Sequence, residues 1–144
     1  MNLKVVVIDS DQQRSAVLLS KIKISKLCNT GVSFSGNQQA LFHITKKVNP
    51  DDNFLVFLNF ESDTLAYFDF LRAVRHPAFY ANVLVIILYS SPATIAERFR
   101  SERQVLSVIQ SPVLVEDINL CGIKALNRIL SAEGAAFQPV CVAV

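Results

Sequence analysis

The stretch Leu3-Lys4-Val5-Val6-Val7-Ile8-Asp9-Ser10-Asp11 decides the fold of this chain. The run from Leu3 to Ile8 is rich in β-branched residues and lacks a regular alternation with polar ones. Such a run predicts a strand that is buried on both faces of a parallel sheet. Polar residues follow directly, and Ser10 with Gln13 three residues later predicts a capping box at the start of a helix.

The same strand and helix pattern recurs along the whole chain. The predicted strands are Leu3–Ile8, Val32–Ser35, Phe54–Leu58, Val83–Leu88 and Val105–Ile109. The predicted helices follow each strand in turn, from the capping box at Ser10 to about Lys26 and then over Asn37–Lys47, Asp63–Arg75, Ser91–Ser101 and Glu116–Leu130. Residues 49–53 have the composition of a turn. The order is strand then helix, five times.

Apolar residues at helical spacing predict the faces of these helices that meet the core. The expected inward residues are Val17, Leu18, Ile22 and Ile24, then Leu41, Ile44 and Val48, and finally Leu120, Ile123, Leu126 and Leu130. Alternating strands and helices imply parallel strands joined by right-handed crossovers. The predicted fold class is therefore α/β, a flavodoxin-like doubly wound sheet of five parallel strands.

Length and composition indicate one domain. A chain of 144 residues, 51% of them hydrophobic and 18% charged, is expected to bury a sizeable core. We expect residues 1–131 to form this domain and residues 132–144 to form an apolar C-terminal tail. A net charge of +2 is too small to favour binding to nucleic acid or to a membrane surface.

Targeting signals and cysteine chemistry are not indicated by the sequence. We find no signal-peptide pattern and no apolar run of about 20 residues, so we expect a cytoplasmic protein. Cys28, Cys121 and Cys141 are odd in number and have no CxxC spacing. We therefore interpret them as reduced thiols with no metal or redox role.

The candidate site lies where the strands end. In doubly wound sheets, ligands bind beyond the carboxyl ends of the strands. The segments that reach this edge are Asp9–Asp11, Asn59–Glu61, Tyr89–Ser91 and Ser111–Pro112.

This pattern resembles the receiver domain of bacterial response regulators over residues 3–131. The resemblance implies acidic residues after the first strand that bind magnesium, and a phosphate-accepting aspartate after the third. It also implies a threonine or serine after the fourth strand, and a lysine before a proline after the fifth.

The residues at these positions differ from the family pattern. The acidic pair falls on Asp9 and Ser10, with Asp11 as a partial substitute, and the phosphate acceptor falls on Asn59. The hydroxyl position falls on Tyr89, or on Ser90 if the register slips by one. Ser111 replaces the lysine before the retained Pro112, and the family's cis bond before this proline is expected here too.

These substitutions predict a receiver that has lost its phosphorylation chemistry. An amide is a poor nucleophile, and a buried lysine would lack partners once the carboxylates are gone. Asp9 and Asp11 remain weak candidates for binding magnesium, and no other cofactor is expected. The residual pocket is expected to contain Asp9, Ser10, Asp11, Asn59, Glu61, Tyr89, Ser90, Ser111 and Pro112.

Basic residues after the fourth predicted strand suggest an interaction surface. Arg98, Arg100 and Arg103 cluster there, where a solvated helix face is the simpler interpretation. The resemblance implies that the fourth helix, fifth strand and fifth helix form a surface for dimerisation or docking. The expected partner is a histidine kinase or an output protein, or a second copy of the chain.

Three functions follow from these observations. The first is a stand-alone receiver-like module, not an enzyme, that acts through phosphorylation-independent protein binding. The second is an unorthodox receiver switched by a metal ion or small anion at Asp9, Asp11 and Asn59. The third is a flavin-binding electron carrier, which the lack of a glycine-rich phosphate loop disfavours and which a yellow colour would reveal.

Overall fold

A computed structural model of the chain describes residues 2–25, 27, 31–46, 52–60, 64–75, 83–90 and 102–137. It contains one sheet of five parallel strands in the order β2-β1-β3-β4-β5. The strands are β1 (Asn2–Ile8), β2 (Gly31–Phe34), β3 (Asp52–Phe60), β4 (Val83–Tyr89) and β5 (Val105–Gln110). The predicted fold class is confirmed.

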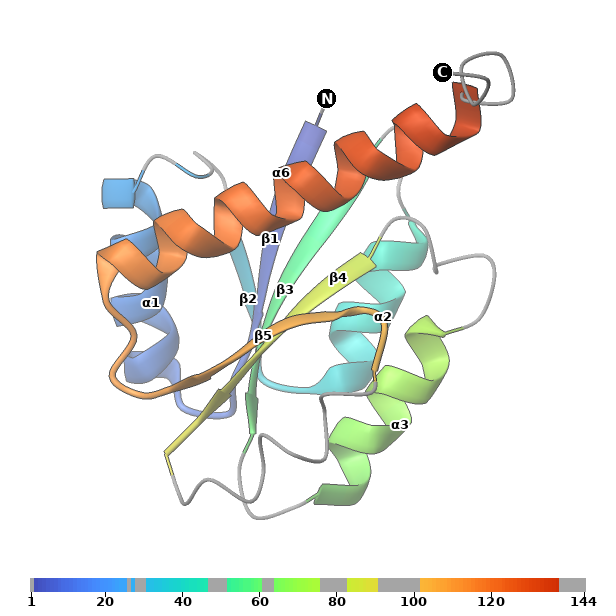
Figure 1. Cartoon of the computed structure of the whole chain (residues 1–144). Helices are drawn as coiled ribbons and strands as arrows, with labels where there is room; N and C mark the ends of the chain where they lie inside the picture. The colour runs from blue at the N-terminus through green and yellow to red at the C-terminus, as the bar shows by residue number, and fades with distance from the viewer. Residues whose placement is uncertain are drawn as a thin grey trace.

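The helices cover both faces of this sheet (Figure 1). They are α1 (Gln12–Ser25), α2 (Asn37–Thr45), α3 (Thr64–Val74) and α6 (Val115–Phe137). Alternate strand residues face opposite layers: Val5 and Val7 pack with α1 and α6, whereas Val6 and Ile8 pack with α2 and α3. Two apolar cores therefore lie on the two sides of the sheet, which explains why the strand sequences do not alternate.

The centre of the sheet is β3, which pairs with both β1 and β4. All nine of its residues are buried. The sequence-based interpretation of residues 52 and 53 as part of a turn is wrong, because Asp52 and Asn53 are the first residues of this strand. Asp52 is accommodated there by an ion pair to Lys4 Nζ on the neighbouring strand, at 2.9 Å.

The core-facing sides of α1 and α6 differ from those predicted. In α1, Leu18 and Ile22 are buried as expected, but Val17 and Ile24 are 54% and 67% exposed. In α6 all four predicted core residues lie on the outer side, with 44% to 57% of their surface exposed: Leu120, Ile123, Leu126 and Leu130. The side that meets the sheet consists of Ile118, Cys121, Ala125 and Ile129. We name the four exposed residues the outer stripe of α6.

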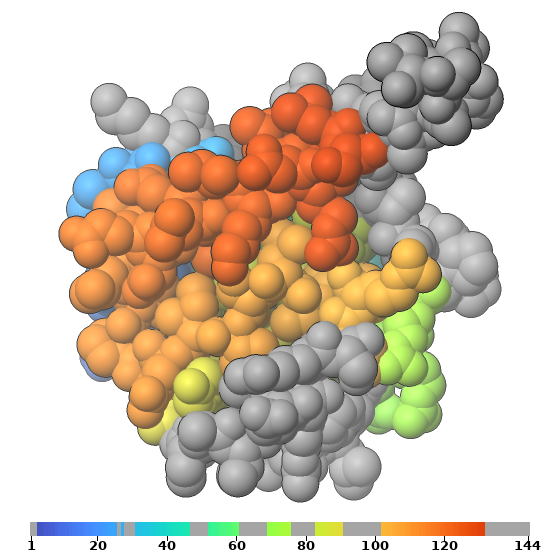
Figure 2. Space-filling model, in the orientation of Figure 1, coloured from blue at the N-terminus to red at the C-terminus, as the bar shows by residue number. Residues whose placement is uncertain are grey.

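The last helix is also longer than predicted. It ends at Phe137 and not near Leu130, so residues 132–137 continue the helix. Three alanines in this segment favour the helical state. Figure 2 shows α6, in orange to red, lying across the visible face of the molecule.

Several expectations lie outside the described residues. They include the predicted helix Ser91–Ser101, the expected inward residue Val48 and the segment after Phe137. Within the described ranges, none of the helices is both long enough and apolar enough to cross a membrane.

Candidate functional site

A cavity of about 350 Å³ opens at the carboxyl ends of the strands, beside α1. Three parts of the chain form its walls: the ends of β1, β3 and β4, one side of α1, and the loop between β5 and α6. The lining residues are Asp9, Arg14, Val17, Leu18, Lys21, Asn59, Leu88, Ser111, Pro112 and Val113.

The strand ends bring two polar residues into the cavity wall. Asp9 follows β1, and its backbone N–H donates to the carbonyl oxygen of Phe34 at 3.0 Å, which extends the sheet by one step. Asn59 is the last but one residue of β3 and lies beside Leu88 of β4. Asp9 and Asn59 are only 5% and 6% exposed, so this end of the sheet places a carboxylate and an amide in a buried setting.

The Asp9 carboxylate is paired with a cation from the chain itself. Arg14, in the first turns of α1, donates from Nε to Oδ2 at 2.5 Å and from Nη2 to Oδ1 at 2.6 Å. The Asp9 Oδ1 atom also accepts the backbone N–H of Asp11 at 2.9 Å. Paired contacts between a guanidinium and a carboxylate are among the strongest polar contacts in proteins. The charge of Asp9 is therefore balanced within the site.

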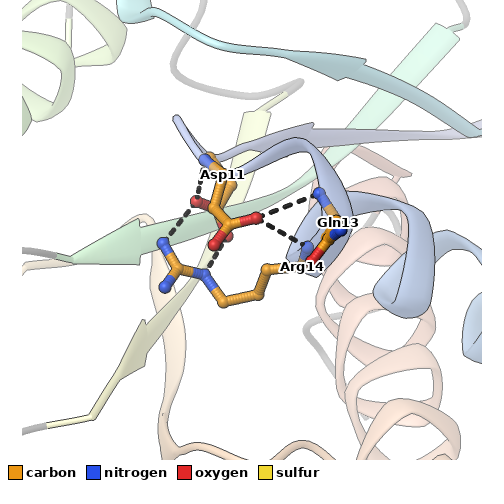
Figure 3. A network of polar contacts seen from close by, with 4 residues as sticks. Asp11, Gln13 and Arg14 are labelled. Carbon is orange, nitrogen blue, oxygen red and sulfur yellow. Dashed lines mark hydrogen bonds and ion pairs between the residues drawn. The ribbon is translucent and has the colours of Figure 1, made fainter.

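Asp11 caps the N-terminus of α1. Its Oδ1 atom accepts the backbone N–H groups of Gln13 at 3.0 Å and of Arg14 at 3.1 Å, as Figure 3 shows. The predicted capping box that starts at Ser10 is therefore wrong. The helix begins one residue later than that motif requires, at Gln12, which places Asp11 at the N-cap.

A bulge in β5 sets the position of Ser111. The pairing of β5 with β4 shifts between Val85 and Ile86, so that Leu106 is the extra residue. Beyond this shift the residues of β4 and β5 pair one to one. The Ser111 backbone N–H then donates to the Tyr89 carbonyl oxygen at 2.7 Å. The Ser111–Pro112 peptide bond is cis, as the resemblance implied.

The loop after this bond is tied to α1. Lys21 Nζ donates to the carbonyl oxygen of Val113 at 2.7 Å, a contact between residues 92 positions apart. Lys21 lies two helical turns beyond Arg14, and so the same side of α1 supplies both cations. The cavity thus lies between one side of α1 and the cis-proline loop.

The predicted pocket residues are only partly brought together. Asp9, Asn59, Ser111 and Pro112 line the cavity, whereas Ser10, Asp11, Tyr89 and Ser90 do not. Tyr89 packs against the core on the α2 and α3 side of the sheet, because it points the opposite way from Leu88. Glu61 lies outside the described residues.

The two candidate metal ligands are already engaged. The Asp9 carboxylate contacts Arg14, and the Asp11 carboxylate accepts backbone N–H groups at the start of α1. Among the residues that the structure describes, no group of three or more His, Cys, Asp or Glu side chains is placed to hold a metal ion. A cation at Asp9 would compete with the guanidinium of Arg14 for the same carboxylate.

Sequence reasoning missed the two basic residues of the cavity. Arg14 and Lys21 are not among the site residues predicted from the sequence. A usable signal was their spacing, because they are seven residues apart and flank Leu18, a core residue of the same helix. Basic residues beside the inward face of a helix that follows Asp9 are well placed to reach its carboxylate.

The predicted interaction surface is described only in part. Arg98 and Arg100 lie outside the described residues. Arg103 is exposed, and its carbonyl oxygen accepts from Arg128 Nη1 at 2.8 Å. Nearby on the same side of α6, Lys124 Nζ donates to Ser107 Oγ of β5 at 2.8 Å. We name Arg103, Lys124 and Arg128 the basic strip.

Comparisons with known proteins establish the fold but no closer relationship. No protein-family model matches the sequence, and no curated protein is significantly similar to it. A two-component response regulator from Cytophaga hutchinsonii matches with a TM-score of 0.74 at 14% identity, covering 88% of this chain and 98% of that chain. A receiver protein from Dyadobacter fermentans matches with a TM-score of 0.72 at 12% identity, covering 83% and 94%.

The similarity extends to a chemotaxis regulator. CheY4 of Vibrio cholerae matches with a TM-score of 0.63 at 15% identity, covering 90% of this chain and 99% of that one. At such low identities a structural match establishes the fold alone. The chain therefore has the fold of response-regulator receiver domains.

Proposed function

We propose that this chain is a receiver-like signalling module that acts through protein binding and does not depend on phosphorylation. The observation that carries the proposal is the Arg14–Asp9 ion pair at the end of β1. In the receiver family, acidic residues at this position bind the magnesium ion that phosphorylation requires. Here the guanidinium of Arg14 supplies the positive charge that a metal ion would otherwise supply.

The other cavity residues support the same proposal. Phosphoryl transfer needs a nucleophilic oxygen, a divalent cation and a further cation opposite the developing charge. At the acceptor position implied by the resemblance, Asn59 offers an amide, and at the lysine position Ser111 offers a neutral hydroxyl. Both line the cavity with Asp9. This set of groups supports a binding role and not an enzymatic one.

Treatment with acetyl phosphate and magnesium, or with beryllium fluoride, tests this proposal. We expect intact-mass analysis to show no phosphoryl adduct and calorimetry to show no tight binding of beryllium fluoride. A receiver domain with a complete acceptor site, treated in parallel, controls for the activity of the reagents. One stable phosphoryl group on a cavity residue of this chain would refute the proposal.

We further propose that the partner is another protein of a bacterial signalling pathway, a histidine kinase or an output protein, bound through the basic strip. The strip places the Lys124 and Arg128 side chains of α6 against β5 and against the segment before it, which contains the exposed Arg103. A symmetric homodimer would bring like charges together, so the strip favours an acidic partner protein over a second copy.

Charge reversal tests the surface. The Arg103→Glu and Arg128→Glu double variant should bind a partner captured from the source cells at least tenfold more weakly, while its thermal stability changes little. The control is Arg72→Glu, because Arg72 is an exposed residue of α3, on the other face of the sheet. Equal loss of binding in the control would rule out a specific role for the strip.

A further inference from the structure

We propose that the cavity between α1 and the cis-proline loop is a binding site for a small carboxylate with an apolar body. This inference concerns a ligand and goes beyond the proposed partner binding. It can be tested on the purified chain alone. The argument rests on the size of the cavity, the character of its walls and the balance of its charges.

The size of the cavity fits a small organic molecule. Its volume of about 350 Å³ lies at the lower end of the range of roughly 300–1,000 Å³ that is usual for ligand pockets. A cavity of roughly 150 Å³ in another protein accommodates benzene. The present cavity therefore has room for one or two rings, or for a short alkyl chain, together with a polar group.

The walls are mostly apolar, so the ligand needs an apolar body. Five lining residues are hydrocarbon in character, and they come from three separate parts of the chain: Val17, Leu18, Leu88, Pro112 and Val113. Val17 is 54% exposed although it stands at the cavity wall. A ligand that covered Val17 would remove this apolar surface from water, which favours binding.

The charges of the cavity favour one negative charge on the ligand. Among the residues that the structure describes, the charged ones that line the cavity are Asp9, Arg14 and Lys21. Arg14 balances Asp9 through two contacts, which leaves the charge of Lys21. In the described part of the chain Lys21 has no carboxylate partner, and its ammonium donates to the Val113 carbonyl oxygen. An ammonium has three N–H donors, so two remain for a ligand.

A carboxylate satisfies these conditions better than phosphate does. One negative charge matches the net charge of +1 of the three ionisable groups, whereas a dianion would leave an excess negative charge next to buried Asp9. Lys21 lies at the loop end of the cavity, where it is held by Val113. We therefore infer that the carboxylate contacts Lys21 and that the apolar body lies against Val17, Leu18 and Leu88.

The experiment is a titration of the full chain, followed by protein NMR, with phenylacetate, octanoate and 2-naphthoate. The matched probes are 2-naphthylmethanol, which lacks the charge, and inorganic phosphate, which lacks the apolar body. We expect at least one carboxylate to bind with saturation at millimolar concentration or below and to shift the signals of Val17, Leu88 and Val113. The alcohol and phosphate should each bind at least tenfold more weakly.

Three variants link this binding to the cavity. Lys21→Met keeps the aliphatic stem and removes the charge, so it should weaken carboxylate binding about tenfold and leave binding of the alcohol unchanged. Lys23→Met is the control, because Lys23 is an exposed residue of the same helix and does not line the cavity. Val17→Phe should fill the cavity from its exposed rim and abolish binding of every probe.

Defined results would overturn the inference. Absence of saturable binding of all three carboxylates would refute it, as would equal binding of the alcohol. If phosphate bound as tightly as the carboxylates, the cavity would be a site for inorganic anions and the apolar body would have no role. These outcomes are independent of the partner-binding test, which needs no ligand.

Discussion

The guanidinium of Arg14 and the carboxylate of Asp9 form a two-point ion pair in which the carboxylate is buried and the arginine is 42% exposed. Replacing Arg14 by Ala should lower the free energy of unfolding by about 1–3 kcal/mol, because it leaves a buried charge without its cation. The lower half of this range is expected, since water that replaces the exposed guanidinium will hydrate Asp9. Urea denaturation measures the change.

The control for this prediction is Arg72→Ala. Arg72 and Asp69 form a looser pair, with 3.8 Å between Nη1 and Oδ1, and both side chains are largely exposed. The Arg72→Ala change should lower the free energy of unfolding by less than about 0.5 kcal/mol, as for other ion pairs at protein surfaces. If the Arg14 and Arg72 variants lost the same stability, the pair at Asp9 would have no special structural role.

The start of α1 provides a second prediction. Asp11→Ala should reduce stability by about 1 kcal/mol, because two backbone N–H groups lose their acceptor. Ser10→Ala should cost clearly less, because Ser10 is exposed and is not the N-cap. Thermal denaturation of the two variants distinguishes them, and a larger effect at Ser10 would restore the capping box predicted from the sequence.

Adjacent residues of α6 test which side of the helix meets the sheet. Ile129 is 6% exposed, whereas Leu130 is 49% exposed. Ile129→Ala should lower the free energy of unfolding by about 2–4 kcal/mol, and Leu130→Ala by less than about 1 kcal/mol. Chemical denaturation provides both values. The reverse order would mean that the outer stripe packs on the sheet, in place of the side that carries Ile118 and Ile129.

Cys121 makes stability depend on pH in the alkaline range. Burial raises the pKa of its thiol from 9.0 to about 11. Between these values the thiol ionises in the unfolded chain but not in the folded one, so stability should fall as pH rises from 9.0 to 11. The slope contributed by this group is at most about 1.4 kcal/mol per pH unit.

The matched variant for this prediction is Cys121→Ala, studied in a Cys28→Ser and Cys141→Ser background. It should show a flatter dependence of stability on alkaline pH, even if its stability is lower at neutral pH. In the folded protein, Cys121 should also react slowly with thiol reagents, because little thiolate is present. An unchanged slope would show that other groups account for the alkaline loss of stability.

The sequence predicted the sheet well because the strand residues are buried on both faces. Continuous apolar runs such as Phe54–Leu58 have few alternative interpretations in a chain of alternating elements. The ends of the strands were less predictable. Asp52 and Asn53 have the composition of a turn, and only their pairing with β1 makes them part of β3. Register along a neighbouring strand is not encoded locally.

The helix faces could not be predicted because two helices are apolar on more than one side. In α6 the buried side contains Cys121 and Ala125, which are weaker hydrophobic signals than the leucines of the outer stripe. A pattern based on large apolar residues therefore selected the wrong side. Small residues allow a helix to approach a sheet closely, and this advantage becomes visible only in the packed structure.

The sequence predicted where the candidate site lies in the fold, but not which side chains contact one another there. Strand ends identified Asp9, Asn59 and Ser111, since all parallel strands end at the same edge. The role of Arg14 depends on where a side chain in the first turns of α1 can reach, and that of Lys21 depends on a loop 92 residues away. The spacing of the two basic residues around Leu18 indicates the side of the helix on which they lie, but not the atoms that they contact.

The position of β3 also determines how the protein opens to solvent. Its amides bond to strands that are themselves covered by helices, so they can exchange their hydrogens for deuterium only when the sheet comes apart. β2 is a strand of four residues at one edge of the sheet, and it can detach from the sheet at a smaller cost in free energy. Asn59 lies on this central strand and Arg14 near the start of α1, so we expect the backbone amides of the two facing walls of the cavity to exchange at different rates.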